Sequence, residues 1–383
     1  MKKVINLSFV KLLKARIESN SGLVQVVLGP RQVGKTTTTL KLLDEHYRSK
    51  SIYVSADSVF NPDHGWLRSN WQLALQDKKI LVIDEIQKCY NWAESIKALY
   101  DGTKREKRRL TCILLGSSSL EIQKGLSESL TGRFQLIRTQ HWNFAESHLG
   151  YGLSFDDFLH YGGYPGSYEL IETNDWYDYV KNSIISTVVE KDILQFSKVK
   201  NPALFRQAFE LLISYPAQEI SYTKLLGQLQ DRGNVELIKH YISLYEGAYL
   251  IKTLEKYSPK AIKVKTSSPK IIPLAPALAF LPIRSRFSTE ERGRAFEALV
   301  GAQLLRTGED IFYWREGDSE IDFVLKKGRL LWGIEVKSGR KKSGTGLDVF
   351  KRKFPNARAI VITVDNYKSF ERDPMKFLEG EQV

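Results

Sequence analysis

One segment constrains the fold of this chain more than any other. Residues 29–36 read GPRQVGKT and match the pattern GxxxxGK, followed by Ser or Thr, at every fixed position. Loops with this pattern turn backbone N–H groups inward, where they can cradle the phosphates of a nucleotide such as ATP. We expect Lys35 to reach the β- and γ-phosphates, and the hydroxyl of Thr36 to hold Mg²⁺. The predicted nucleotide-binding residues are those of the loop and the one after it: Gly29, Pro30, Arg31, Gln32, Val33, Gly34, Lys35, Thr36 and Thr37.

The residues on both sides of this loop support the same interpretation. Residues 23–28 form an apolar, β-branched run that is typical of a buried parallel strand, and residues 37–43 read as the helix that follows. Gly29 and Gly34 would be needed because the backbone must approach the phosphates in conformations that a Cβ resists. The alternative is a glycine-bearing turn without a ligand. Strand, loop and helix together favour nucleotide binding and a parallel α/β sheet.

A second nucleotide motif is predicted at residues 79–85, where the apolar run of KILVIDE ends in two carboxylates. In P-loop ATPases the end of this strand lies beside the phosphate loop. We expect Asp84 to bind Mg²⁺, through water or through Thr36, and Glu85 to polarise the attacking water. The alternative is a strand that merely ends in acidic residues at an exposed tip.

Further polar groups are candidates for contacting the γ-phosphate. Residues 110–115 form another buried strand followed by GSSS, so Ser117 or Ser118 could sense that phosphate, although such a run alone is more often a turn. Arg133 is the candidate for an arginine that acts on the nucleotide of a neighbouring subunit, because its planar guanidinium spans two phosphate oxygens. The alternative is a surface arginine that precedes a strand.

Together these motifs resemble those of the prokaryotic AAA+-type ATPases of the archaeal ATPase group. The matching segments are GPRQVGKT, VIDEIQ, the Gly-Ser-Ser strand end, SLTGR, and YGGYP at residues 161–165, which is similar to a signature in the helical lid of those proteins. The resemblance implies that Arg133 is an arginine finger, that Gln87 belongs to the second motif, and that the protein forms homo-oligomers. We accordingly expect an AAA+-type core over residues 1–145 and a helical lid over residues 146–200.

Residues 201–270 are predicted to form a winged helix-turn-helix. Helical periodicity indicates three helices, after which residues 249–254 read as a strand. Lysines along the ribbon would suit phosphate contacts, which give affinity without sequence preference. The alternative is a helical packing domain with a solvated lysine face. The lysines concerned are Lys252, Lys256, Lys260, Lys263, Lys265 and Lys270.

Residues 285–383 resemble the PD-(D/E)xK, or restriction-endonuclease-like, α/β fold, with an expected order of helix, three strands, helix and strand. Residues two apart in a strand face the same way, so Glu335 and Lys337 share a face that Asp322 and Glu297 can join. Asp322 and Glu335 would hold Mg²⁺, and Lys337 would orient or deprotonate a water. The alternatives are a solvated sheet face, or a domain that binds DNA without cutting it. A phosphate track nearby would use Lys341, Lys342, Lys351, Arg352 and Lys353.

The amino-acid composition of the chain indicates what kind of partner the protein binds and in which cellular compartment it lies. The chain of 383 residues is long enough for two or three domains, and its net charge of +13 favours an acidic partner, with nucleic acid first. Cys89 and Cys112 are too few for a disulfide framework, and no segment approaches the length of a membrane span. We therefore expect a cytoplasmic protein with no membrane partner.

The sequence thus favours an oligomeric ATPase that uses ATP and Mg²⁺ and acts on duplex or branched DNA without sequence preference, and it leaves cleavage open. One alternative is a nucleotide-dependent signalling switch that binds a protein partner through its C-terminal domains. Another is a stand-alone nuclease with a structural ATPase. A steep fall of DNA affinity with salt would separate the first reading from the switch.

Overall fold

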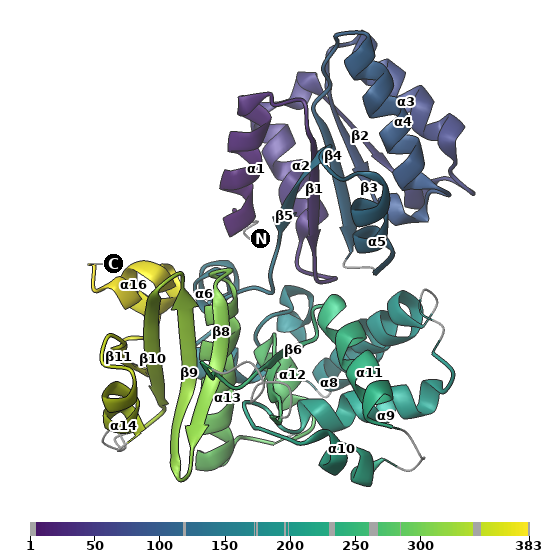
Figure 1. The fold of residues 1–383 in the computed structure, drawn as a ribbon. Coiled ribbons are helices and arrows are strands. Elements are labelled where there is room, and N and C mark those ends of the chain that lie inside the picture. The colour runs from purple at the N-terminus through teal and green to yellow at the C-terminus, as the bar shows by residue number, and fades with distance from the viewer. Residues whose placement is uncertain are drawn as a thin grey trace. The chain divides into compact units, whose positions relative to one another are not determined.

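The chain forms two compact units in the computed structural model of Figure 1. The nucleotide unit comprises residues 1–141 and 190–197, and the C-terminal unit comprises residues 142–189 and 198–383. Structure is described for residues 5–117, 120–171, 173, 175–194, 197, 199–229, 234–259, 267–283, 285–339 and 346–381. No helix within these ranges is long and apolar enough to cross a membrane.

A five-stranded parallel sheet of order β2-β3-β4-β1-β5 forms the centre of the nucleotide unit (Figure 1). This sheet confirms the α/β class predicted for this part of the chain. Its strands are β1 (Val24–Gly29), β2 (Ser51–Ser55), β3 (Ile80–Asp84), β4 (Cys112–Ser117) and β5 (Phe134–Arg138). The helices and 3₁₀ segments are α1 (Ser8–Ser19), α2 (Lys35–His46), η1 (Arg48–Lys50), η2 (Ala56–Ser58), α3 (His64–Gln76), η3 (Ile86–Lys88), α4 (Trp92–Arg105) and α5 (Leu120–Ser129).

The direction of the strands decides where a site can form in this unit. All residues of β1, β3 and β4 are buried, as their apolar sequences predict, because helices cover the sheet. Alternate residues of these strands, with apolar residues of α3, α4 and α5, form one hydrophobic core. Since the strands are parallel, their last residues meet at one edge, here called the carboxyl edge, and their first residues meet at the amino edge.

The first part of the C-terminal unit is mainly helical. Within residues 201–270, three helices of the described chain precede the antiparallel pair β6 (Ile251–Leu254) and β7 (Lys270–Pro273), which is the order of helices and ribbon predicted there. The π-helical segment η6 spans the boundary between the two units. The helical elements are α6 (Phe144–Tyr151), α7 (Phe155–Tyr161), η4 (Pro165–Leu170), α8 (Asp175–Asp178), η5 (Tyr179–Ile185), η6 (Thr187–Ile193), α9 (Pro202–Ile213), α10 (Tyr222–Gln228), α11 (Val235–Gly247) and α12 (Pro276–Phe280).

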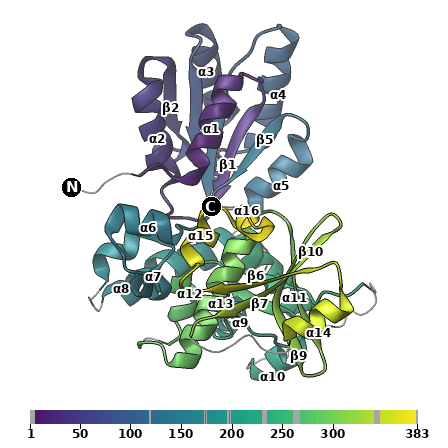
Figure 2. The same cartoon turned by 90° about the vertical axis from the view of Figure 1, so that its left-hand side faces the viewer.

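A four-stranded sheet of order β11-β10-β9-β8 completes this unit (Figure 1). Helix α13 (Thr289–Leu305) packs against this sheet (Figure 2). The hairpin strands β8 (Asp310–Glu316), β9 (Ser319–Lys327) and β10 (Leu330–Lys337) are antiparallel, and β11 (Arg358–Thr363) runs parallel to β10. This is the order of helix, three strands, helix and strand expected here. The remaining helices are α14 (Gly346–Lys353), α15 (Tyr367–Arg372) and α16 (Pro374–Glu379).

Candidate functional site

The predicted phosphate loop lies at the carboxyl edge, between the end of β1 and the start of α2. Its two glycines are required for different reasons. Gly34 has a φ of 84°, which lies in the left-handed region that glycine adopts without strain. A Cβ on Gly29 would lie 1.8 Å from Oγ1 of Thr139, so this glycine is needed for packing at the end of the strand.

The other residues of the predicted loop have contrasting environments. Pro30 has no backbone N–H, so it cannot donate to a phosphate. Val33 is fully buried and contributes apolar packing. Gln32 is exposed, with a φ of 63°, and Arg31 is half-buried. Thr37 is exposed in the first turn of α2.

Lys35 is held against this loop. Its Nζ donates hydrogen bonds to the carbonyl oxygens of Gly29, at 3.0 Å, and of Pro30, at 2.6 Å. Hydrogen bonds between an ammonium and a charged oxygen are stronger than those to a neutral carbonyl. A phosphate oxygen that reached the loop would therefore compete well for Lys35.

Asp84, the last residue of β3, joins three other residues at the carboxyl edge. Its Oδ2 accepts hydrogen bonds from Thr36 Oγ1 at 2.7 Å and from the Tyr53 hydroxyl at 2.8 Å. Its Oδ1 accepts from the backbone N–H of Glu85 at 2.9 Å. Burial, followed by the bond to Asp84, raises the pKa of Tyr53, so this phenol remains a donor. The structure thus brings together Thr36 and Asp84, the two residues predicted to contact Mg²⁺, and adds Tyr53, which sequence reasoning missed.

Glu85 and Gln87 extend this network from β3 toward β4. Glu85 has a φ of 49°, a strained conformation for a residue with a Cβ, and such strain is concentrated at functional sites. Gln87 Nε2 donates to a carboxylate oxygen of Glu85 and, at 3.3 Å, to Oγ of Ser117. The structure therefore places Ser117 beside the second motif. Ser118, the other candidate sensor, lies outside the described residues.

The oxygens of Thr36 and Asp84 fit the way in which proteins bind Mg²⁺. This ion is usually held by one or two protein oxygens together with nucleotide phosphates and water. In the described ranges, no group of three or more His, Cys, Asp or Glu residues could hold a metal by itself. The site therefore fits Mg²⁺ together with a nucleotide, where the ion would neutralise phosphate charge.

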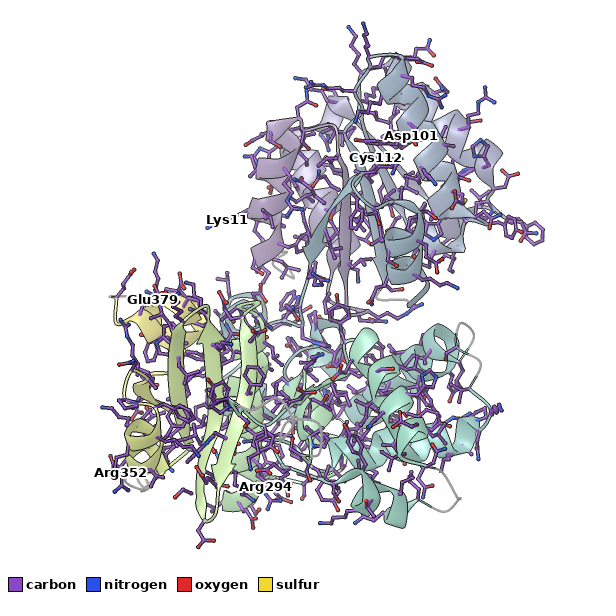
Figure 3. The ribbon with its side chains drawn as sticks, viewed as in Figure 1. Lys11, Asp101, Cys112, Arg294, Arg352 and Glu379 are labelled. Atoms are coloured by element: carbon purple, nitrogen blue, oxygen red, sulfur yellow. The ribbon has the colours of Figure 1, made fainter. Side chains whose placement is uncertain are left out.

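Arg133 lies at the amino edge, away from this network. It directly precedes β5, and its carbonyl oxygen accepts a hydrogen bond from the N–H of Val24, the first residue of β1. The length of β1, about 17 Å at 3.3 Å per residue, separates this point from the phosphate loop. The guanidinium of Arg133 binds both carboxylate oxygens of Asp101, at 2.8 and 3.0 Å. Figure 3 shows Asp101 toward the same end of the unit as Cys112, which begins β4.

The C-terminal unit brings the four predicted nuclease-like residues to one region. Glu335 and Lys337 share a face of β10 and form an ion pair with an oxygen–nitrogen distance of 2.5 Å. On the adjacent β9, Oδ2 of Asp322 accepts a hydrogen bond from the N–H of Val336 at 2.7 Å. Glu297 projects from α13, the helix that packs against these strands.

A fifth residue, Lys270, also lies in this cluster, and its prediction as a DNA-contacting lysine on an exposed ribbon is wrong. Only 6% of the residue is exposed; its Nζ pairs with Glu297 and donates to the carbonyl oxygen of Asp322 at 3.1 Å. The Nζ also lies 4.9 Å from the centroid of the Phe323 ring. Burial acts to lower the pKa of Lys270, but the charges of Glu297 and Asp322 raise it, so the ammonium is retained.

Lysine side chains lie among the carboxylates of this cluster. Glu297 is paired with Lys270, and Glu335 is paired with Lys337. Burial, followed by the charge of Glu297, raises the pKa of Asp322 to about 7. No metal-binding group of three such residues occurs in the part of the chain that the structure describes. The positive charge among these carboxylates is instead supplied by lysine side chains.

Replacing Lys270 with methionine is expected to destabilise the C-terminal unit by about 2–3 kcal/mol, because the partly buried carboxylate of Glu297 loses its ion-pair partner. Urea unfolding would measure this loss, and adding Glu297→Gln should restore part of it. Lys252→Met is the matched control: Lys252 pairs with Glu246 at 2.8 Å, but its side chain is 45% exposed. Glu246 would keep two hydrogen bonds from Thr253, so a loss of about 1 kcal/mol or less is expected. Equal losses for the two lysines would contradict a special role for Lys270.

The other basic residues predicted to contact DNA in this unit differ in their exposure and in their ion pairs. Lys252 is paired, as above, and Lys256 is half-buried. On α14, Lys351 and Arg352 are exposed, and Lys353 pairs with Glu316. The remaining candidates lie outside the described residues: Lys260, Lys263, Lys265, Lys341 and Lys342.

Comparisons with known proteins bear on the nucleotide unit most directly. Residues 21–148 match the family model described as AAA domain. Residues 152–280 and 292–378 match two models that are each described as a domain of unknown function. The first match supports an AAA-type ATPase, as the resemblance implied. The other two give the winged-helix and nuclease-like interpretations no support.

The individual proteins that are similar to this chain do not establish its activity. An uncharacterized protein of Methanocaldococcus jannaschii, MJ1544, is 25% identical over 354 residues, which are 84% of this chain and 75% of the relative. The Thermotoga maritima RuvB Holliday junction branch migration motor is 16% identical, with a TM-score of 0.31 over 65% of this chain and 87% of its own. AMPPCP-bound DnaA from Aquifex aeolicus is 14% identical, with a TM-score of 0.31 over 62% and 86%. At these scores the two structures carry no argument about function.

Proposed function

We propose that this protein is an Mg²⁺-dependent ATPase that acts on DNA. The observation that carries the ATPase part is the arrangement of Lys35, Thr36, Asp84 and Glu85 around one loop at the carboxyl edge. In this proposal Lys35 binds the β- and γ-phosphates, Thr36 and Asp84 hold Mg²⁺, and Glu85 orients the attacking water. Ser117 would contact the γ-phosphate from the neighbouring strand.

The proposal that the ATPase acts in a homo-oligomer rests on the position of Arg133. As placed beside Asp101 at the amino edge, it cannot reach the phosphate loop of its own subunit. If Arg133 stabilises a γ-phosphate, that nucleotide must therefore belong to a neighbouring copy. We place the protein in the cytoplasm, since the thiols of Cys89 and Cys112 are free and buried.

DNA is proposed as the partner because of charge. The net charge of +13 favours a polyanion, and contacts to phosphates give binding without sequence preference, to duplex or branched DNA. We further propose that the nuclease-like fold grips DNA and does not cut it, because Lys270 and Lys337 pair with two of its three carboxylates. The winged-helix assignment of α9–α11 and β6–β7 remains part of this proposal.

Fluorescence anisotropy with a labelled duplex, in a series of salt concentrations, tests the DNA part. The proposal expects log Kd to rise linearly with log salt, because phosphate contacts release counterions. Absence of binding at low salt would instead favour the signalling switch, which binds a protein. An affinity that does not change with salt concentration would also argue against phosphate contacts.

A further inference from the structure

We propose that the amino edge of the nucleotide-unit sheet binds the phosphate backbone of duplex DNA; this inference rests on the proposed function and names its contact surface. Two hollows of about 530 and 690 Å³ lie at this edge and share Arg108, Arg109 and Leu110. Their walls come from the segments that precede strands β1 to β5. We call this surface the basic edge.

The charged residues that line the basic edge are all basic. No acidic residue lines either hollow, as far as the chain is described, whereas basic residues from three separate segments do. Lys79 and Arg108 have partly exposed partners, Asp77 at 3.0 Å and Glu106 at 3.5 Å. The other basic lining residues have no ion pair within the described ranges: Lys50, Lys78, Lys104, Lys107 and Arg109. Like charges gathered in this way repel one another, so a polyanion would be attracted to them.

The form of the basic edge suits a nucleic-acid backbone better than a small anion. A small-anion site needs buried donors that converge on one point, whereas these side chains, except the half-buried Lys79, are exposed and follow an edge of the sheet. Residues 104–109 read KREKRR, a run typical of nucleic-acid contact. The backbone there is fixed, since the N–H of Arg108 donates to the carbonyl of Thr103 at 3.0 Å. Long cations on a fixed edge can contact successive phosphates without reading bases.

The basic edge lies at the opposite end of the sheet from the phosphate loop, so DNA and the nucleotide would bind at separate places. The phosphate loop lies at the other end of β1, about 17 Å away by strand length. DNA on the basic edge would therefore leave the nucleotide site of the same subunit open, and Arg133, which pairs with Asp101, lines neither hollow. The surface differs from the ribbon lysines predicted from the sequence, of which Lys270 is buried.

The test compares two triple variants of the full chain. Lys104→Gln, Lys107→Gln and Arg109→Gln together remove three charges from the basic edge. The matched control removes three charges from exposed positions of α1, α3 and α5, with Lys11→Gln, Arg68→Gln and Lys124→Gln; Figure 3 shows Lys11 pointing away from α1. Duplex affinity is measured by anisotropy over a salt series, and ATP turnover is measured without DNA.

The proposal expects the edge variant to lose on the order of tenfold or more in affinity and about three units of salt slope, one for each phosphate contact. The control should lose much less, and both variants should retain turnover without DNA. Equal losses in the two variants would overturn the proposal, and so would a loss of DNA-free turnover in the edge variant alone, which would assign the edge to a neighbour's nucleotide. Failure of the unmodified protein to bind DNA would instead refute the proposed function itself.

Discussion

Replacing Lys35 with alanine should reduce ATP turnover by on the order of a hundredfold to a thousandfold while the fold remains intact. The Nζ of Lys35 bonds to the carbonyls of Gly29 and Pro30, both in the loop, so its loss removes a phosphate ligand while α2 and β1 keep their backbone hydrogen bonds. Phosphate release measures the turnover, and thermal unfolding measures the fold.

Lys41→Ala is the matched control for this change. Lys41 lies on the same helix, α2, and its ammonium is 3.8 Å from Glu45 at the surface. Its loss should leave turnover within a few-fold of the unmodified protein. If Lys35→Ala turned over ATP as fast as Lys41→Ala, hydrolysis would have to occur elsewhere in the molecule.

Replacing Arg133 with alanine should reduce turnover by on the order of a thousandfold, the lower end of the range for arginine fingers. The physical reason is charge: the guanidinium would neutralise negative charge that develops on the transferred phosphoryl group. Because Arg133 lies a strand length away from the loop of its own subunit, the effect must pass between subunits.

Co-expression of Arg133→Ala and Lys35→Ala subunits separates this role from a structural one. An Arg133→Ala subunit keeps its own phosphate loop and can receive the arginine of a Lys35→Ala neighbour, so mixed oligomers should regain turnover that neither variant shows alone. Asp101→Asn keeps the arginine and removes its carboxylate partner, and it should retain turnover. Mixed oligomers as inactive as their parents would show that Arg133 does not act in trans.

The nucleotide site was largely predictable from the sequence because its chemistry is local. Residues 29–36 specify their own turn, and a strand that ends in Asp84 must finish beside that turn in a parallel sheet. Tyr53 and Asp101 could not be assigned in this way. Their partners depend on β2 lying next to β3, and on α4 lying near the start of β5, which are long-range pairings that residue spacing does not determine.

The C-terminal unit shows how burial can reverse an interpretation based on composition. Lys270 belongs to a stretch with several lysines, which indicated an exposed ribbon. The contrary signal was its place at the start of the apolar run Ile271–Ile272, because a strand that is buried on both faces also buries its lysine. Four nuclease-like residues were placed near one another, yet the fifth residue supplies the charge expected of a metal ion.

ATP turnover by the purified protein with Mg²⁺, with and without DNA, tests the central claim most directly. Linear duplex, single-stranded and four-way-junction DNA would be compared, with Lys35→Ala as the blank and the DNA examined on a gel. Our account predicts that at least one DNA form stimulates turnover and that the DNA remains uncut. Turnover that no DNA form changes, in a protein that binds none of them, would contradict the account and direct the search to a protein partner.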